Sequence, residues 1–126
     1  MISRIFGCVV AGVLLVAAGA QGQSGAAAER LAAALRFPTV SHQAEAHDET
    51  AFRGLHRYLE QQFPSTHETL TRETVAGLSL LYTWPGTDPS LAPMLLTSHL
   101  DVVPAPPSTL ASWQHPPFDG VIADGF

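Results

Sequence analysis

Proline limits what this 126-residue chain can fold into more than any other feature of its sequence. Five of the ten prolines lie between residues 103 and 118, at positions 104, 106, 107, 116 and 117. Because proline fixes φ and has no N–H to donate, such a segment is unsuited to a regular helix or an inner strand. We therefore predict irregular structure for residues 103–118. A chain of this length forms at most one small domain. Its helices and strands must therefore precede residue 103.

Two helices are expected in the first half of the chain. Helix formers run from about residue 26 to residue 36, before Pro38, which disfavours helix at the residue preceding it. Asp48 is a capping residue for a second helix, which should end before Pro64. The second helix carries apolar side chains at three- to four-residue spacing, namely Phe52, Leu55, Leu59 and Phe63. This face should pack on a core.

Strands are expected after the second helix. Residues 66–75 and 78–84 are enriched in strand formers, and residues 85–89 form a Pro-Gly-Thr-Asp-Pro turn. The short apolar run at residues 93–98 fits a buried central strand. The order of helices and strands predicts an α/β fold.

The first twenty residues have the features of an export signal. Arg4 supplies a positive charge, residues 5–18 contain no charged side chain, and Ala18-Gly19-Ala20 is a small-x-small pattern that signal peptidase accepts. We interpret residues 1–20 as a signal peptide and residues 21–126 as the exported, secreted or periplasmic, part. An uncleaved membrane anchor is the alternative, because the apolar stretch approaches the roughly 20 residues that span a bilayer.

Charge and cysteine content exclude several classes of function. The chain has 11 acidic and 6 basic residues, a net charge of -5, and its arginines are scattered. Nucleic acid is therefore not an expected partner. The single cysteine, Cys8, lies in the predicted leader and cannot form an internal disulfide or a thiolate zinc cluster.

Polar chemistry follows the predicted central strand in the triplet His99-Leu100-Asp101. In extended backbone, residues two apart project from the same face. A carboxylate beside an imidazole fixes its tautomer and raises its basicity, as a metal ligand requires. From the residues alone, two interpretations stay open. His99 is a metal ligand oriented by Asp101, or it is an ordinary exposed histidine followed by a turn-forming aspartate.

The other titratable side chains are assigned to solvent, packing or turns. We expect four histidines to be solvated, namely His42, His47, His56 and His67. His115, near Trp113, either shapes the mouth of the site or has a packing role, and packing is the favoured interpretation. Asp119 and Asp124 each precede a glycine and are explained by turns.

The sequence around the His-x-Asp triplet resembles a known family. Residues 95–104 (LLTSHLDVVP) closely resemble the zinc signature of the M20 metallopeptidases, and residues 106–120 resemble the loop that follows it. With residues 35–40 and 86–91 included, the chain is most similar to the secreted carboxypeptidase S and N-fatty-acyl-amino-acid hydrolase branch. The resemblance implies the amino-terminal part of an M20-type catalytic domain, of the zinc exopeptidase (phosphorylase/hydrolase-like) fold, with an incomplete sheet.

The resemblance also implies a chemistry. In the family, two zinc ions activate water to attack an amide of a small peptide or N-acyl amino acid. The position matched by His99 is a zinc ligand, and the position matched by Asp101 is the catalytic-site acid that orients it. The bridging carboxylate, the Glu general base and the other ligands lie further along the chains of relatives. We therefore expect this chain to be a fragment that is inactive by itself.

The expected zinc affinity of such a fragment is weak. A complete four-ligand site is worth about 10 to 16 kcal/mol, so one imidazole should supply on the order of a quarter, an affinity near millimolar. A non-enzymatic exported binding domain is the alternative function. In that case Trp113, Phe118 and the proline-rich loop would bind a partner, and the His-x-Asp triplet would be a relic.

Overall fold

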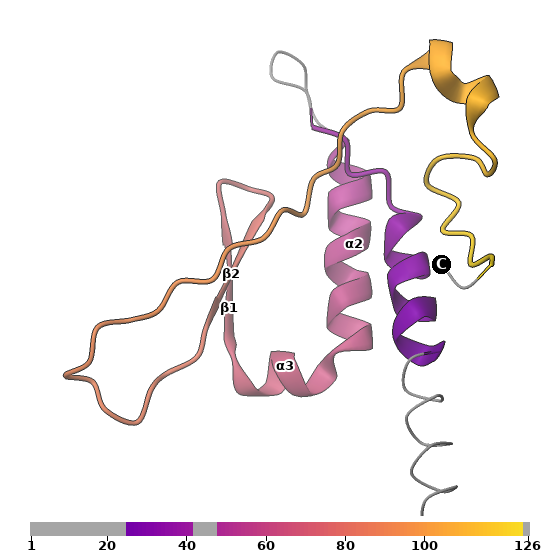
Figure 1. Cartoon of the computed structure of the whole chain (residues 1–126). Coiled ribbons are helices and arrows are strands. Elements are labelled where there is room, and N and C mark those ends of the chain that lie inside the picture. The colour runs from indigo at the N-terminus through magenta and orange to yellow at the C-terminus, as the bar shows by residue number, and fades with distance from the viewer. Residues whose placement is uncertain (1–24, 42–47, 125–126) are drawn as a thin grey trace, which may run out of the picture.

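The computed structural model describes residues 25–41 and 48–124. The predicted leader, His42 and His47 lie outside these ranges. Residues 25–35 are helical and are called the first helix. The elements after it are α2 (Glu49–Gln62), α3 (Pro64–Thr69), β1 (Thr71–Val75), β2 (Ser79–Thr83) and the 3-10 helix η1 (Pro107–Ser112). The first helix and α2 lie side by side, the β1–β2 hairpin stands to one side, and the rest of the chain returns past the hairpin to both helices (Figure 1).

The helix α2 begins where the sequence predicts. The Asp48 carboxylate accepts hydrogen bonds from the backbone N–H groups of Thr50 at 2.9 Å and Ala51 at 3.4 Å. It thereby satisfies donors that have no partner inside the helix. On the inner face of α2, Ala51, Phe52 and Leu55 are buried, and with Ala32 of the first helix they form the apolar core of the described residues.

Aromatic side chains join the first helix to α2. The Tyr58 hydroxyl donates to the Arg30 carbonyl at 2.8 Å, and the rings of Phe37 and Tyr58 are 5.6 Å apart. Gly54 allows this contact, because a Cβ at that position would lie 2.9 Å from the Phe37 ring. The first predicted helix is confirmed to within a residue at its carboxyl end.

The strand prediction for residues 66–75 is correct only for its second half. Pro64 starts the short helix α3, since the first position of a helix needs no N–H donor. Strand β1 follows and pairs antiparallel with β2, from Thr71 opposite Thr83 to Val75 opposite Ser79. The prediction for residues 78–84 is confirmed by β2.

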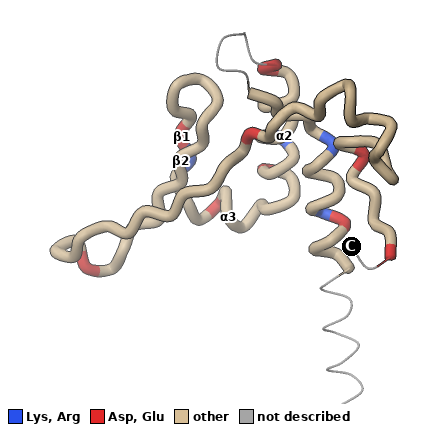
Figure 2. The backbone as a smooth tube through the Cα atoms, turned by 45° about the horizontal axis from the view of Figure 1, so that its top comes forward, with Lys and Arg blue, Asp and Glu red and all other residues tan. Residues whose placement is uncertain are grey.

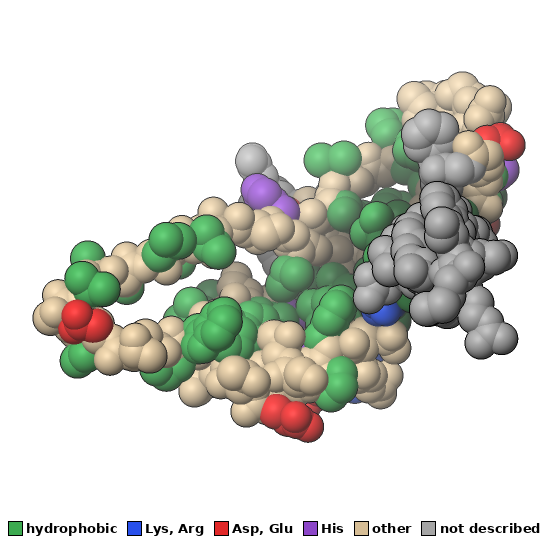
Figure 3. All heavy atoms as spheres, turned by 60° about the horizontal axis from the view of Figure 1, so that its bottom comes forward, with side chains coloured by type: hydrophobic (Ala, Val, Ile, Leu, Met, Phe, Trp, Pro, Cys, Tyr) green, Lys and Arg blue, Asp and Glu red, His purple; other side chains and the backbone are tan. Residues whose placement is uncertain are grey.

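The prediction of a buried central strand at residues 93–98 is wrong for this structure. These residues belong to no helix or strand, and Met94 and Leu96 are each 85% exposed. A buried strand needs neighbours to pair with its backbone and layers to cover its faces, and the described residues supply neither. Figure 3 shows apolar side chains along this extended segment and along the facing hairpin, with an opening between them.

The prediction of irregular structure for residues 103–118 is wrong at one place, because this segment contains a short 3-10 helix. Pro107 opens the helix η1, and Thr109 donates to the Pro106 carbonyl through both its N–H and its hydroxyl, each at 2.9 Å. A 3-10 helix of this length requires few N–H donors, so proline at its start is compatible with it.

Acidic and basic residues are scattered along the backbone tube of Figure 2. None of the described helices has the length and apolar character needed to cross a bilayer.

Candidate functional site

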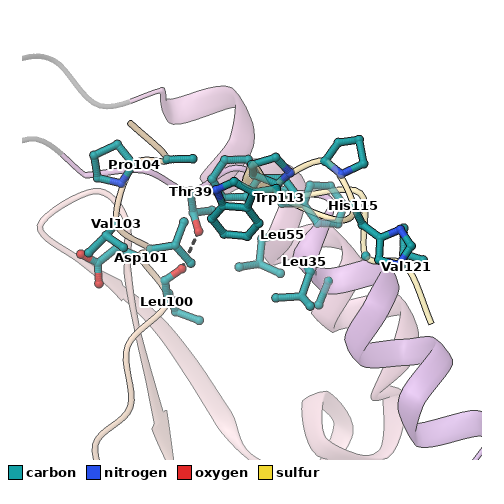
Figure 4. A pocket seen from close by; sticks show the side chains of 18 of the residues that line it. Leu35, Thr39, Leu55, Leu100, Asp101, Val103, Pro104, Trp113, His115 and Val121 are labelled. Atoms are coloured by element: carbon teal, nitrogen blue, oxygen red, sulfur yellow. Dashed lines mark hydrogen bonds between the residues drawn. The ribbon is translucent and has the colours of Figure 1, made fainter. Parts of the chain in front are cut away.

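Two segments far apart in the sequence lie together at the site. Residues 39–41 run beside residues 100–102 and form a parallel bridge between Val40 and Val102. The Val102 N–H donates to the Thr39 carbonyl at 3.0 Å, and the Thr39 hydroxyl donates to the Leu100 carbonyl at 2.7 Å, the bond drawn in Figure 4. Thr39 is only 1% exposed. We call this pairing the parallel clamp.

The clamp holds the His99–Asp101 pair. The Nδ1 atom of His99 lies 2.8 Å from Oδ1 of Asp101, and the Ser41 hydroxyl donates to Oδ2 of the same carboxylate at 2.5 Å. The Ser41 bond, followed by the His99 bond, holds the pKa of Asp101 below its ordinary value. An ionised carboxylate only accepts hydrogen bonds, so the Nδ1 atom of His99 carries the proton of this bond. In the neutral form of such an imidazole, Nε2 keeps its lone pair.

Both residues line an open pocket of about 890 Å³. One wall comes from the two helices, with Leu35 and Leu55, and the other from residues 99–106 and 113–121, with Trp113 (Figure 4). Most of this lining is apolar. The His99 side chain is 90% exposed, and no described residue hydrogen-bonds its Nε2 atom. The predicted pairing at an accessible cavity is therefore present.

A close backbone contact places the second wall of the pocket. Gly120, at φ 54°, lies so near the first helix that a Cβ would come within 1.9 Å of the Ala32 carbonyl oxygen. The Arg36 side chain donates to the Asp119 carbonyl at 3.0 Å beside this contact. Only glycine fits at position 120, where the left-handed backbone conformation and the contact coincide.

The prediction that His56 is solvated is wrong. Its side chain points into the protein from α2, the residue is only 8% exposed, and its buried Nε2 atom has no hydrogen-bond partner among the described residues. Burial is the main cause that lowers the pKa of His56, with further contributions from Arg72 and Arg53 against an opposing hydrogen bond at the Leu78 backbone. Helical periodicity places residue 56 next to the apolar face of α2, and this position could have predicted its burial from the sequence.

The expectation that His67 is solvated is only partly met, because the residue is half-buried and both ring nitrogens have partners. Its Nδ1 atom lies 2.9 Å from the Phe63 carbonyl and its Nε2 atom 2.9 Å from the Tyr82 hydroxyl. The two rings meet edge to face at 5.4 Å. With both nitrogens engaged, His67 joins α3 to β2 and is unsuited to bind a metal.

The remaining assignments concern the loop that follows the site. His115 lines the pocket and is exposed, so the favoured packing role is wrong and the alternative, a place at the pocket, is the one the structure shows. Asp119 donates its N–H to the Pro116 carbonyl at 3.3 Å, and Asp124 has a φ of 52°, both consistent with turns. Ser41 and Thr39 were not identified as site residues from the sequence, because their contacts with residues 100–102 lie about sixty positions away.

Zinc is the metal that the sequence resemblance implies. The His99–Asp101 pair is compatible with one ligand of a zinc site. A zinc-binding histidine characteristically donates its second ring N–H to a carboxylate, which is the arrangement of His99 and Asp101. Within residues 25–41 and 48–124, no group of three or more His, Cys, Asp or Glu side chains is placed to hold a metal ion. The described residues thus fit a single zinc ligand and its orienting acid.

Known proteins resemble the chain over most of its length. It is 46% identical to carboxypeptidase S of Saccharomyces cerevisiae over 98 residues, which cover 73% of this chain and 17% of that protein. It is 42% identical over 102 residues to the probable carboxypeptidase S-like 2 of Dictyostelium discoideum, covering 79% and 19% of the two chains. The chain is a homologue of M20 family enzymes.

This M20 homologue is also 40% identical to the human N-fatty-acyl-amino acid synthase/hydrolase PM20D1 over 99 residues, covering 77% of this chain and 19% of that protein. The chain thus spans about a fifth of the length of the curated relatives it matches. No family model matches it, and no solved structure does. The expected relation to the M20 family is confirmed, and the chain is related to carboxypeptidase S and PM20D1 hydrolases.

Proposed function

We propose that the chain is the amino-terminal part of a zinc-dependent M20 hydrolase that cleaves amide bonds of small peptides or N-acyl amino acids. The observation that carries the proposal is the pair formed by His99 and Asp101, 2.8 Å apart at an open pocket, in a homologue of carboxypeptidase S and PM20D1. The names of those relatives supply the substrate class.

Each residue of the pair has its own role in this proposal. His99 offers Nε2 as a zinc ligand, and Asp101 keeps the proton on Nδ1 by accepting its hydrogen bond. When bound by a complete set of ligands, zinc supplies a water of lowered pKa at neutral pH. The apolar walls of the pocket, including Leu55 and Trp113, would receive an apolar substrate group.

The cellular location belongs to the same proposal. Residues 1–20 act as a signal peptide, so the protein is secreted or periplasmic, and retention of that segment would leave it anchored in a membrane. A periplasmic or extracellular hydrolase would meet peptides and acylated amino acids from the surroundings.

Zinc titration of the full chain, followed by NMR of the histidine rings, tests the role of His99. We expect the His99 ring signals to shift first, with a dissociation constant near millimolar because one imidazole supplies about a quarter of a complete site. The variant His99→Gln should lose this response, whereas His115→Gln, which removes another exposed histidine lining the same pocket, should retain it. An unchanged zinc response in His99→Gln would contradict the proposal and favour a non-enzymatic binding domain.

A further inference from the structure

Each of the two oxygens of the Asp101 carboxylate accepts a hydrogen bond from a different residue. Oδ1 accepts from His99 and Oδ2 accepts from the Ser41 hydroxyl, a residue 60 positions earlier. The Asp101 side chain is 38% exposed and that of His99 is 90% exposed, so packing does little to orient either group. The terminal torsion of an aspartate is soft. Hydrogen bonds therefore decide how this carboxylate is turned.

We propose that Ser41 is a positioning residue that acts on His99 through Asp101. By holding Oδ2, the Ser41 hydroxyl turns Oδ1 toward the Nδ1–H group of His99. This keeps the imidazole in the tautomer whose free Nε2 lone pair is available to a metal at the pocket. The metal part of this inference rests on the proposed function, whereas the effect of Ser41 on the imidazole does not.

A purely structural role for Ser41 predicts a different result. The parallel clamp also contains the bond from the Thr39 hydroxyl to the Leu100 carbonyl and that from the Val102 N–H to the Thr39 carbonyl. These two bonds do not involve Ser41, and Thr39 is buried. Removal of the Ser41 hydroxyl should therefore leave residues 39–41 beside residues 100–102 while it frees the carboxylate to rotate.

The tautomer of His99 is the measurement that separates the two roles. In the full, metal-free chain labelled with ¹⁵N-histidine, the ring nitrogen shifts at about pH 8.5, a pH above the ordinary range of histidine, give the ratio of Nδ1–H to Nε2–H forms. His99→Gln identifies the signals. In Ser41→Ala we expect this ratio to fall about threefold to tenfold, since a hydrogen bond to a charged group has been lost. Ser41→Thr, which retains a hydroxyl, should keep the ratio of the parent chain.

Ser90→Ala is the matched control. The Ser90 hydroxyl donates to the Asp88 carboxylate at 2.7 Å, so this variant removes the same kind of bond away from the pocket and should leave the His99 ratio unchanged. Protection of the Val102 N–H from exchange reports whether the clamp persists. Where Ser41→Ala does not fold, Ser41→Cys, with a similar size and a weaker donor, should give an intermediate ratio.

The proposal is overturned by an unchanged ratio in Ser41→Ala or Ser41→Cys, or by an equal fall in Ser90→Ala. A predominance of the Nε2–H form in the parent chain would overturn it as well. Failure of zinc to shift His99, together with the expected tautomer change, would reject the proposed function and leave the role of Ser41 in place. The reverse combination would reject only the role of Ser41.

Discussion

At the scale of single residues, burial and hydrogen bonding separate histidines that look alike in the sequence. His99 is exposed and tied to a carboxylate, His67 is engaged at both nitrogens, and His56 is buried with Nε2 unpartnered among the described residues. A buried neutral imidazole costs less than a buried imidazolium, particularly between Arg53 and Arg72. The folded state should therefore favour the neutral form of His56.

His56 should make the stability of the chain depend on pH. Its pKa is lowered in the folded state, so the unfolded chain binds more protons as the pH falls below the ordinary value of 6.5. The stability due to neutral His56 is fully present above that pH and is lost as the pH falls through the lower, folded-state pKa. Urea unfolding midpoints between about pH 8 and pH 5 measure this loss.

The matched variants for this prediction are His56→Phe and His115→Gln. His56→Phe should flatten the pH dependence, because the buried titrating group is gone. His115→Gln removes an exposed histidine and should keep it. Equal slopes in His56→Phe and the parent chain would assign the effect to other groups.

At the scale of elements, boundaries follow local rules, whereas the placement of the loops depends on individual contacts. Asp48 caps α2 and Pro64 opens α3, both through interactions within a few residues. The wall of the pocket formed by residues 113–121 instead depends on the approach of Gly120 to the first helix. A single methyl group at position 120 should be enough to push residues 113–121 away from the first helix.

Gly120→Ala should destabilise the chain more than Gly77→Ala. Both glycines have positive φ, 54° and 87°, so both variants bear the backbone cost of about 1 to 2 kcal/mol. A Cβ at position 77 meets open space, whereas one at position 120 collides with the Ala32 backbone. Overpacking should add about 1 to 3 kcal/mol for Gly120→Ala. Denaturant unfolding measures the difference, and equal losses would exclude a tight contact at Gly120.

At the scale of the whole molecule, the small core and the large exposed apolar side chains have one cause. Within residues 25–41 and 48–124, the buried apolar residues are Ala32, Ala51, Phe52 and Leu55, while Met94 and Leu96 are exposed. Burial of one such large side chain is worth about 1.5 to 3 kcal/mol, but only where other segments provide a surface to cover it. The described residues do not provide that surface for residues 93–98, so the run stays extended and unpaired.

The part of the chain expected to be exported, residues 21–126, should not hydrolyse the proposed substrates by itself. We expect purified residues 21–126 with added zinc to show turnover of dipeptides and N-acyl amino acids no faster than buffer. A single weak imidazole ligand does not hold and activate a metal-bound water. The assay detects release of free amino acid, with full-length yeast carboxypeptidase S as the positive control. Turnover well above buffer that His99→Gln abolishes would contradict this expectation.

Short-range chemistry in the sequence determined the capped helix α2, strand β2 and the spacing that lets Asp101 meet His99. Each depends on residues only a few positions apart, so local rules suffice. Tertiary structure alone decided that Ser41 holds Asp101, that His56 is buried, and that residues 93–98 form no strand. These outcomes depend on segments tens of residues apart meeting, and on which surfaces cover them. Propensity and periodicity do not encode either condition, because pairing and burial are properties of the assembled fold.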